Sequence, residues 1–274
     1  MSKRPQFLVG GSHPLLYLTR DFIIQLGFEL TTEELLDETR PAFLLFGAEV
    51  FHATKALQML DELRDLRHLT IPVLLLSSSS VYGDRDAYLG LREEKPCDEA
   101  QALVLTSSID PDLCRPASAL LAEHAFIQRT NTKTVVLRPF NVYGPSVDHG
   151  VIHRFITAAR LDENLTVYSP GRQVRSFLFE EDYLEAVRVL LSLLLRGGRG
   201  IYNVGSEDRV ELLSLAKSVG HAMGKEAKIE MISTEAVARR HAWWKLPDVD
   251  RLKALRWKPT MSLRSGLFRM TGRS

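Results

Sequence analysis

The sequence predicts an α/β protein built on a doubly wound parallel sheet. Short apolar runs alternate with amphipathic stretches: the runs lie at 6–10, 43–46, 73–76 and 134–140, and the stretches at 14–27, 52–66 and 116–130. Apolar runs separated by helices are typical of parallel strands that are buried on both faces. Right-handed crossovers then place helices on both sides of the sheet, with ligands at the carboxyl ends of the strands.

The chain length and the pattern along the chain predict a large domain with a smaller lobe. The 274 residues are enough to bury a sizeable core. Residues 1–145 carry the strand–helix alternation, and we expect them to form a Rossmann-like domain whose adenosine half is trimmed. Residues 146–274 are expected to form mainly a smaller α/β substrate lobe, partly interleaved with the sheet domain.

Composition excludes several classes of function. Charged residues make up 25% of the chain and the net charge is +1, so neither a nucleic acid nor a membrane surface is an expected partner. No signal peptide is recognised, and no apolar run approaches the ~20 residues that cross a bilayer. Cys97 and Cys114 lack a CxxC spacing, which fits a cytoplasmic protein. His149 and His153 are spaced i, i+4 but have no third ligand, so no metal site is predicted.

Two stretches suggest ligand binding. SSSSVYGD at 77–84 follows an apolar run directly, so its hydroxyls should lie at the carboxyl edge of the sheet, although serines also cap loops. GRQVRSF at 171–177 carries Gln173 and Arg175. The planar guanidinium of an arginine engages phosphate oxygens in pairs, whereas a solvated surface arginine is the simpler reading.

These stretches resemble one family. SSSSVYGD, VVLRPFNVYGP (135–145), IYNVGS (201–206) and KLPDVDRLKALRWKPTMSLRSGL (245–267) are similar to the extended short-chain dehydrogenases/reductases, the NAD-dependent epimerase/dehydratase family acting on nucleotide sugars. The resemblance implies that Ser78 is the catalytic hydroxyl, which bonds the sugar oxygen that is oxidised. It also implies that a UDP- or dTDP-linked sugar is bound by four further residues, Asn141, Gln173, Arg175 and Lys245.

The resemblance also implies a dimer through two helices per subunit, one of them at 116–130. The partner is either a second copy of the chain or a paralogue.

The catalytic pair of the family is replaced. Pro111, Ser118 and Glu123 match the family pattern and place its tyrosine at Arg115 and its lysine at Ala119. A general base must have a pKa near the working pH. An arginine does not lose its proton in a protein, and an alanine carries no titratable group, so neither residue can take over that role.

The first turn departs from the family as well. The family reads G-x-x-G-x-x-G, whereas GGSHPLL keeps Gly10, with Gly11 beside it, and has His13 and Leu16 at the other two places. The resemblance implies NAD or NADP bound at Gly10 and Gly11, and the broken fingerprint argues against it. Residues 31–34, TTEE, are expected to form a capping box with the first threonine as N-cap, rather than to supply a ribose-binding acid at Glu33.

The substrate-side motifs are intact, while the cofactor-side motifs are broken. The sequence therefore favours a nucleotide-sugar-binding member of the family without the usual oxidoreductive activity. Two alternatives stay open. One is an active NAD(P)-dependent epimerase, dehydratase or decarboxylase with an unusual catalytic site, and the other is a non-catalytic interaction scaffold.

Overall fold

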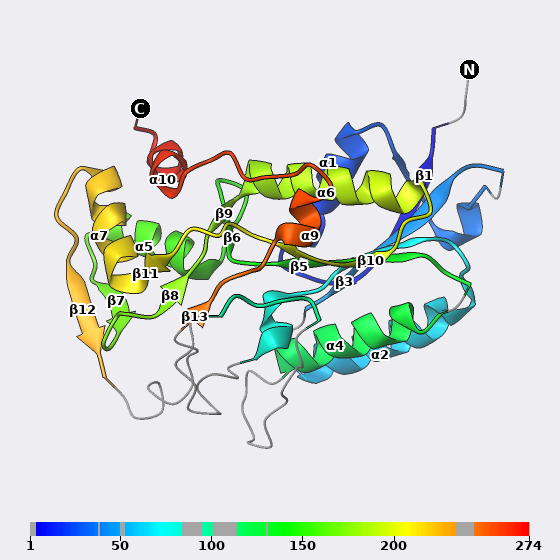
Figure 1. The fold of residues 1–274 in the computed structure, drawn as a ribbon, viewed down its shortest axis with the longest axis horizontal. Helices are drawn as coiled ribbons and strands as arrows, with labels where there is room; N and C mark the ends of the chain where they lie inside the picture. Colours follow the sequence, from blue (N-terminus) through cyan, green and yellow to red (C-terminus); the bar gives the residue numbers. More distant parts are fainter. Residues whose placement is uncertain are drawn as a thin grey trace. The chain divides into compact units, whose positions relative to one another are not determined.

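The chain forms two compact units (Figure 1). A computed structural model describes residues 4–37, 39–49, 53–83, 95–100, 114–129, 131–233 and 244–273. The first unit comprises Met1–Val81, Ser107–Pro139 and Leu184–Tyr202. The second unit comprises Tyr82–Thr106, Phe140–Tyr183 and Asn203–Ser274.

A six-stranded sheet of order β10-β5-β4-β3-β1-β2 is the centre of the first unit. The strands are β1 (Gln6–Ser12), β2 (Glu29–Leu30), β3 (Ala42–Ala48), β4 (Val73–Leu76), β5 (Thr134–Pro139) and β10 (Gly200–Val204). Parallel pairing joins β1 to β2 and β3, β3 to β4, and β4 to β5. The predicted doubly wound α/β class is therefore confirmed.

Helices cover both faces of this sheet (Figure 1). They are α1 (Leu16–Gln25), α2 (Ala53–Asp65), α4 (Cys114–Ile127) and α6 (Glu180–Leu195). Helices α2 and α4 lie together on one face, and α1 and α6 lie on the other. Burial on both faces explains why FLLF at 43–46 is apolar at every position: each of its residues is at most 1% exposed. Phe46 in turn meets Phe126 of α4 edge to face.

The strand order reverses beside β1, because β1 lies between β2 on one side and β3 on the other. The expected capping box after β2 is wrong. The 3₁₀ helix η1 (Glu33–Leu35) begins after Thr32, which makes no side-chain cap. The backbone N–H of Thr31 donates to the carbonyl of Phe7 at 2.9 Å, so Thr31 continues the backbone hydrogen bonding to β1, and the helical turn begins later.

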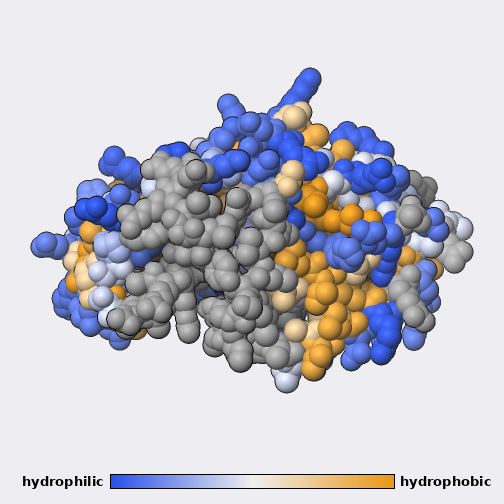
Figure 2. All heavy atoms as spheres, turned by 60° about the horizontal axis from the view of Figure 1, so that its bottom comes forward, coloured by the Kyte–Doolittle hydropathy of each residue, from blue (hydrophilic) through white to orange (hydrophobic). Residues whose placement is uncertain are grey.

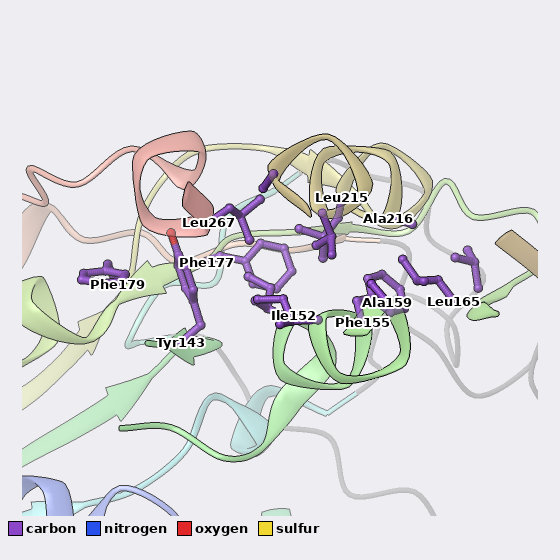
Figure 3. Close-up of a cluster of buried hydrophobic side chains, with 14 residues drawn as sticks. Tyr143, Ile152, Phe155, Ala159, Leu165, Phe177, Phe179, Leu215, Ala216 and Leu267 are labelled. Atoms are coloured by element: carbon purple, nitrogen blue, oxygen red, sulfur yellow. The ribbon is translucent and has the colours of Figure 1, made fainter. Parts of the chain in front are cut away.

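The second unit has its own apolar core between helices (Figure 3). Its helices are α5 (Gly150–Arg160), α7 (Leu212–Met223), α9 (Asp250–Lys253) and α10 (Leu263–Thr271). Its strands are β6 (Val142–Tyr143), β7 (Leu165–Tyr168), β8 (Val174–Arg175), β9 (Leu178–Phe179), β11 (Val210–Glu211), β12 (Ile229–Ile232) and β13 (Trp244–Lys245). The side chain of Tyr143 points from β6 toward α10, where Gly266 leaves room for its hydroxyl (Figure 3).

Candidate functional site

A buried carboxylate lies at the carboxyl edge of the first unit's sheet. Glu49 directly follows β3, and Ser78 lies two residues beyond the end of the neighbouring strand β4. The Ser78 hydroxyl donates to Glu49 Oε1 over 2.6 Å, and both residues are buried. Ser78 Oγ also accepts from the backbone N–H of Ser80 at 3.1 Å. The serine that the sequence singled out is therefore held by a second side chain at the same edge.

Arg115 completes an ion pair with this carboxylate. Its Nη2 lies 2.7 Å and its Nε 3.1 Å from Glu49 Oε1, so the same oxygen accepts from Ser78 and from both guanidinium nitrogens. The Arg115 side chain is 37% exposed, whereas the Glu49 side chain is only 7% exposed. Burial raises the pKa of Glu49, but nearby His13, the Arg115 guanidinium and the Ser78 hydroxyl outweigh it. The pKa of Glu49 therefore lies below its usual value.

Ala119, one helical turn beyond Arg115 on α4, has no accessible surface. The position that the alignment assigns to the family's lysine is thus enclosed by packing. Helix α4 is held at this depth by a second ion pair, in which Arg138 of β5 donates to both oxygens of Glu123. The Ser77 hydroxyl also donates to Glu123, at 2.5 Å, so β4, β5 and α4 are joined by buried polar contacts.

His13 lies where the family fingerprint has its second glycine, and its ring is locked by hydrogen bonds. Nδ1 accepts from the backbone N–H of Leu15 at 3.0 Å. Nε2 lies 2.9 Å from the carbonyl oxygen of Ser77 and 3.5 Å from Glu49 Oε2. The imidazole is buried, and it connects the first turn to the carboxylate at the edge of the sheet.

Gly10 and Gly11, the predicted cofactor-binding residues, lie in the last part of β1. Gly11 has φ of +73°, and a Cβ there would lie 2.0 Å from the carbonyl oxygen of Gly47, so only glycine fits. The backbone N–H of Gly11 donates to Glu62 Oε2 of α2 at 2.7 Å.

The predicted substrate-binding residues lie in the second unit. Arg175 of β8 and Lys245 of β13 are direct register partners in parallel strands, so the structure brings these two cationic residues together. Gln173 precedes β8, is buried, and donates through Nε2 to the carbonyl of Tyr168, while its Oε1 has no hydrogen-bond partner among the residues that the structure describes. Asn141 has φ of +39° and donates through Nδ2 to the carbonyl of Ser176 at 2.9 Å.

Sequence reasoning missed Glu49 and Glu62. For Glu49 a signal was available, because a carboxylate that directly follows a strand as apolar as AFLLFGA lies at the edge where ligands bind. Glu62 gives no such signal. It lies in the exposed part of an amphipathic helix and meets Gly11 only through the packing of α2 near β1.

The described residues contain no group of His, Cys, Asp and Glu side chains that could hold a metal ion. None of the helices in the described ranges has the length and apolar character that crossing a membrane requires.

The fold is similar to the Rossmann folds of solved epimerases and dehydratases. It is similar to dTDP-glucose 4,6-dehydratase from Bacillus anthracis in complex with NAD, with a TM-score of 0.73 and 17% identity over 98% of this chain and 96% of the other. It is also similar to UDP-glucuronic acid 4-epimerase from Bacillus cereus in complex with UDP-glucuronic acid and NAD, with a TM-score of 0.69 and 18% identity over 96% of each chain.

Sequence comparison then defines the family. Residues 48–205 match the NAD dependent epimerase/dehydratase family, and the chain belongs to it. UDP-glucuronic acid decarboxylase 4 of Arabidopsis thaliana is 31% identical over 207 residues, which cover 71% of this chain and 42% of that protein. UDP-glucuronic acid decarboxylase 6 of the same plant is 28% identical over 231 residues, which cover 83% of this chain and 64% of that protein.

The chain therefore spans less than two thirds of the length of these curated relatives. The family resemblance carried by residues 77–84 and 135–145 is confirmed.

Proposed function

We propose that this chain binds a nucleotide sugar without carrying out the oxidoreductive cycle of its family. One observation carries the proposal: the place of the family's tyrosine holds Arg115, whose guanidinium is bonded to the buried carboxylate of Glu49. That carboxylate also receives the Ser78 hydroxyl. With its pKa lowered, Glu49 is a weak base at neutral pH, and it is already occupied by three donors.

The second unit supports binding of a phosphorylated ligand. The register that pairs Arg175 with Lys245 puts two cations side by side, an arrangement that suits a diphosphate. We expect a UDP-linked sugar, because the curated relatives named above act on UDP-glucuronic acid. Asn141 and Gln173 are proposed to contact the same ligand. We propose the cytoplasm as its compartment, because Cys97 and Cys114 lack a CxxC spacing.

Titration with UDP-glucuronic acid tests binding. Replacing Arg175 by alanine is expected to weaken binding about 10- to 100-fold, the usual effect of losing one or two charge-assisted hydrogen bonds. Arg172→Ala is the matched control, because Arg172 is an exposed arginine of the same segment, and it should leave the affinity unchanged. Equal affinities for the two variants and the parent would contradict the proposed site.

A turnover assay tests the loss of chemistry. UDP-, dTDP-, GDP- and CDP-sugars are incubated with NAD or NADP, and products are separated by chromatography. No conversion is expected, because neither Arg115 nor Ala119 can exchange a proton with a sugar hydroxyl. Robust turnover would establish the alternative of an active enzyme with a substitute base.

We further propose that the partner is a second copy of the chain or a paralogue, docked on α2 and α4. Apolar side chains gather on the face formed by these helices (Figure 2). They include Leu57, Leu60, Leu121 and Ile127, which are 39–64% exposed. An apolar patch of this kind on a soluble domain marks an association surface.

Light scattering after gel filtration tests the association surface. Leu121→Asp should shift the protein to a lower mass. Leu161→Asp is the control, since Leu161 is as exposed but lies in the second unit. An identical mass for the parent and both variants would remove the case for this surface.

A further inference from the structure

Backbone N–H groups in the turn after the first strand already donate to acceptors within the protein. In dinucleotide-binding proteins of this architecture, the pyrophosphate is held by backbone N–H groups of the turn between the first strand and the first helix. That turn is short here, because β1 ends at Ser12 and α1 begins at Leu16. The acceptors that these N–H groups have in the structure therefore decide whether a pyrophosphate fits.

A carboxylate takes the first donor. The backbone N–H of Gly11 lies 2.7 Å from Glu62 Oε2. This is the length of a charge-assisted hydrogen bond. The glycine itself is still required, because the close approach of its backbone to Gly47 excludes any side chain. The turn thus keeps the glycine, but the backbone N–H of Gly11 already donates to a carboxylate of the protein itself.

His13 takes the donors at the start of α1. The backbone N–H of Leu15 donates to His13 Nδ1, and the backbone N–H of Leu16 donates to the carbonyl of His13, each at 3.0 Å. The residue between His13 and Leu15 is Pro14, which has no N–H. The backbone N–H groups of Gly11, Leu15 and Leu16 therefore all have acceptors within the chain, and Pro14 has no N–H to offer.

The space around the turn and the charge near it also disfavour a bound pyrophosphate. A Cβ on Gly47 would lie 2.8 Å from the Cβ of His13, so the histidine side chain fills the gap beside the end of β3. Its Nε2 is fixed on the Ser77 carbonyl, which holds the ring in place. Glu62 adds a carboxylate near a position where the family binds two negatively charged phosphates, and like charges repel.

We infer that Glu62 and His13 close the pyrophosphate cradle of this protein, with the Glu62 carboxylate in the role of an internal substitute for a cofactor phosphate. The residues present do not fit NAD or NADP. Glu62 is a specificity-determining residue that excludes a dinucleotide, and its contact is at the surface, where substitution does not disturb the core. The inference rests on contacts other than those behind the proposed function, and it holds whether or not the protein binds a nucleotide sugar.

The experiment titrates the full chain and its variants with ADP and with NAD. ADP contains the pyrophosphate and adenosine but no nicotinamide, so its binding does not depend on the altered Arg115 and Ala119 positions. The unsubstituted protein should show no saturable binding below millimolar ADP. Glu62→Ala should raise the affinity about tenfold, because it returns one backbone N–H and removes one repelling charge. Glu62→Ala with His13→Gly should raise it about a further tenfold.

Two variants separate the causes. Glu62→Gln removes the charge but keeps an oxygen that can accept from Gly11, so its gain should be smaller than that of Glu62→Ala. Asp61→Asn is the control, since it removes a charge from the neighbouring exposed position of α2 and should change nothing. Micromolar binding of ADP or NAD by the unsubstituted protein would overturn the inference. So would an ADP affinity of Glu62→Ala no higher than that of Asp61→Asn.

A spectroscopic readout tests the contact without any ligand. The amide resonance of Gly11 should move on Glu62→Gln substitution and stay in place on Asp61→Asn substitution. An unmoved Gly11 resonance in Glu62→Gln would show that the carboxylate does not hold this N–H. A parallel titration with UDP-glucuronic acid keeps the two ideas apart, because failure to bind that sugar contradicts only the proposed function.

Discussion

The ion pair between Arg115 and Glu49 makes a sharp prediction about stability. Replacing Arg115 by methionine keeps much of the side-chain volume and removes the guanidinium. Glu49, whose side chain is 7% exposed, then keeps Ser78 as a donor but loses its arginine partner. A buried carboxylate without its cation is costly, because the protein interior solvates charge poorly.

The exposure of the two partners determines the magnitude. Breaking a fully buried pair costs about 3–5 kcal/mol, and breaking an exposed pair costs about 0–1 kcal/mol. Because the Arg115 side chain is 37% exposed, water screens part of the interaction. We therefore expect Arg115→Met to lower the free energy of unfolding by about 2 kcal/mol at neutral pH. In a protein of this size that corresponds to a fall in Tm of roughly 4–8 °C.

The effect should depend on pH with a defined sign. The folded protein holds the pKa of Glu49 below its usual value, so the ionised carboxylate contributes stability above the ordinary carboxyl pKa. That contribution is lost as the pH falls through the lowered folded pKa. In Arg115→Met the arginine no longer opposes the effect of burial, so the pKa of Glu49 rises. The variant's deficit should then be largest at pH 7 and shrink toward pH 5 as Glu49 gains a proton.

Thermal and urea unfolding between pH 5 and 8 measure this deficit. The control is Arg64→Met, an arginine of α2 that is 63% exposed and should cost little at any pH. Glu49→Gln with Arg115→Met should remove the pH dependence, because no carboxylate is left to titrate. A loss for Arg115→Met that is the same at every pH, or no larger than that of Arg64→Met, would refute the reasoning.

Three further substitutions test packing and polar contacts within the individual units. Gly266→Ala would put a Cβ 2.2 Å from Tyr143 Oη, so the free energy of unfolding should fall by about 1–3 kcal/mol in thermal unfolding. Adding Tyr143→Phe should restore part of that loss, and an unchanged stability of Gly266→Ala would contradict the close approach. Arg138→Met leaves buried Glu123 without its cation and should cost about 3–5 kcal/mol in urea unfolding, a result that a neutral outcome would contradict. Asp182→Ala removes both carboxylate oxygens, which together accept three hydrogen bonds, and should cost about 1–3 kcal/mol in urea unfolding. An unchanged midpoint would show that these bonds contribute nothing.

Much of the fold was predictable because its signals are local. The apolar run VLLL matches β4 residue for residue, and the helix predicted at 52–66 matches α2 at Ala53–Asp65. Strands that are buried on both faces must be apolar at every position, so they stand out in the sequence. The two-residue strand β2 was missed, because two residues carry no periodicity.

The candidate site was predictable only in part. Ser78, Asn141 and Arg175 could be named as candidates because each lies in a motif that resembles the family, and their roles stay predictions. Lys245 and Arg175 were both predicted to bind the substrate, and that they are register partners in adjacent strands is seen only in the structure. The contact of Glu49 with Arg115 was not predictable, because the two residues are 66 positions apart in the chain. The failed capping box at Thr31 has a similar cause, since a hydrogen bond to Phe7 in another strand decides the conformation of that threonine.

The sequence by itself determined the fold class and the family, because each depends on residue types at known spacings. Only the tertiary structure decided which residues Arg115 and Gly11 contact. Glu49 reaches Arg115, and Glu62 reaches Gly11, across 66 and 51 positions. Such contacts are set by the register of the strands and by the packing of helices against the sheet. A carboxylate's partner is chosen by that geometry, which no local pattern in the sequence encodes.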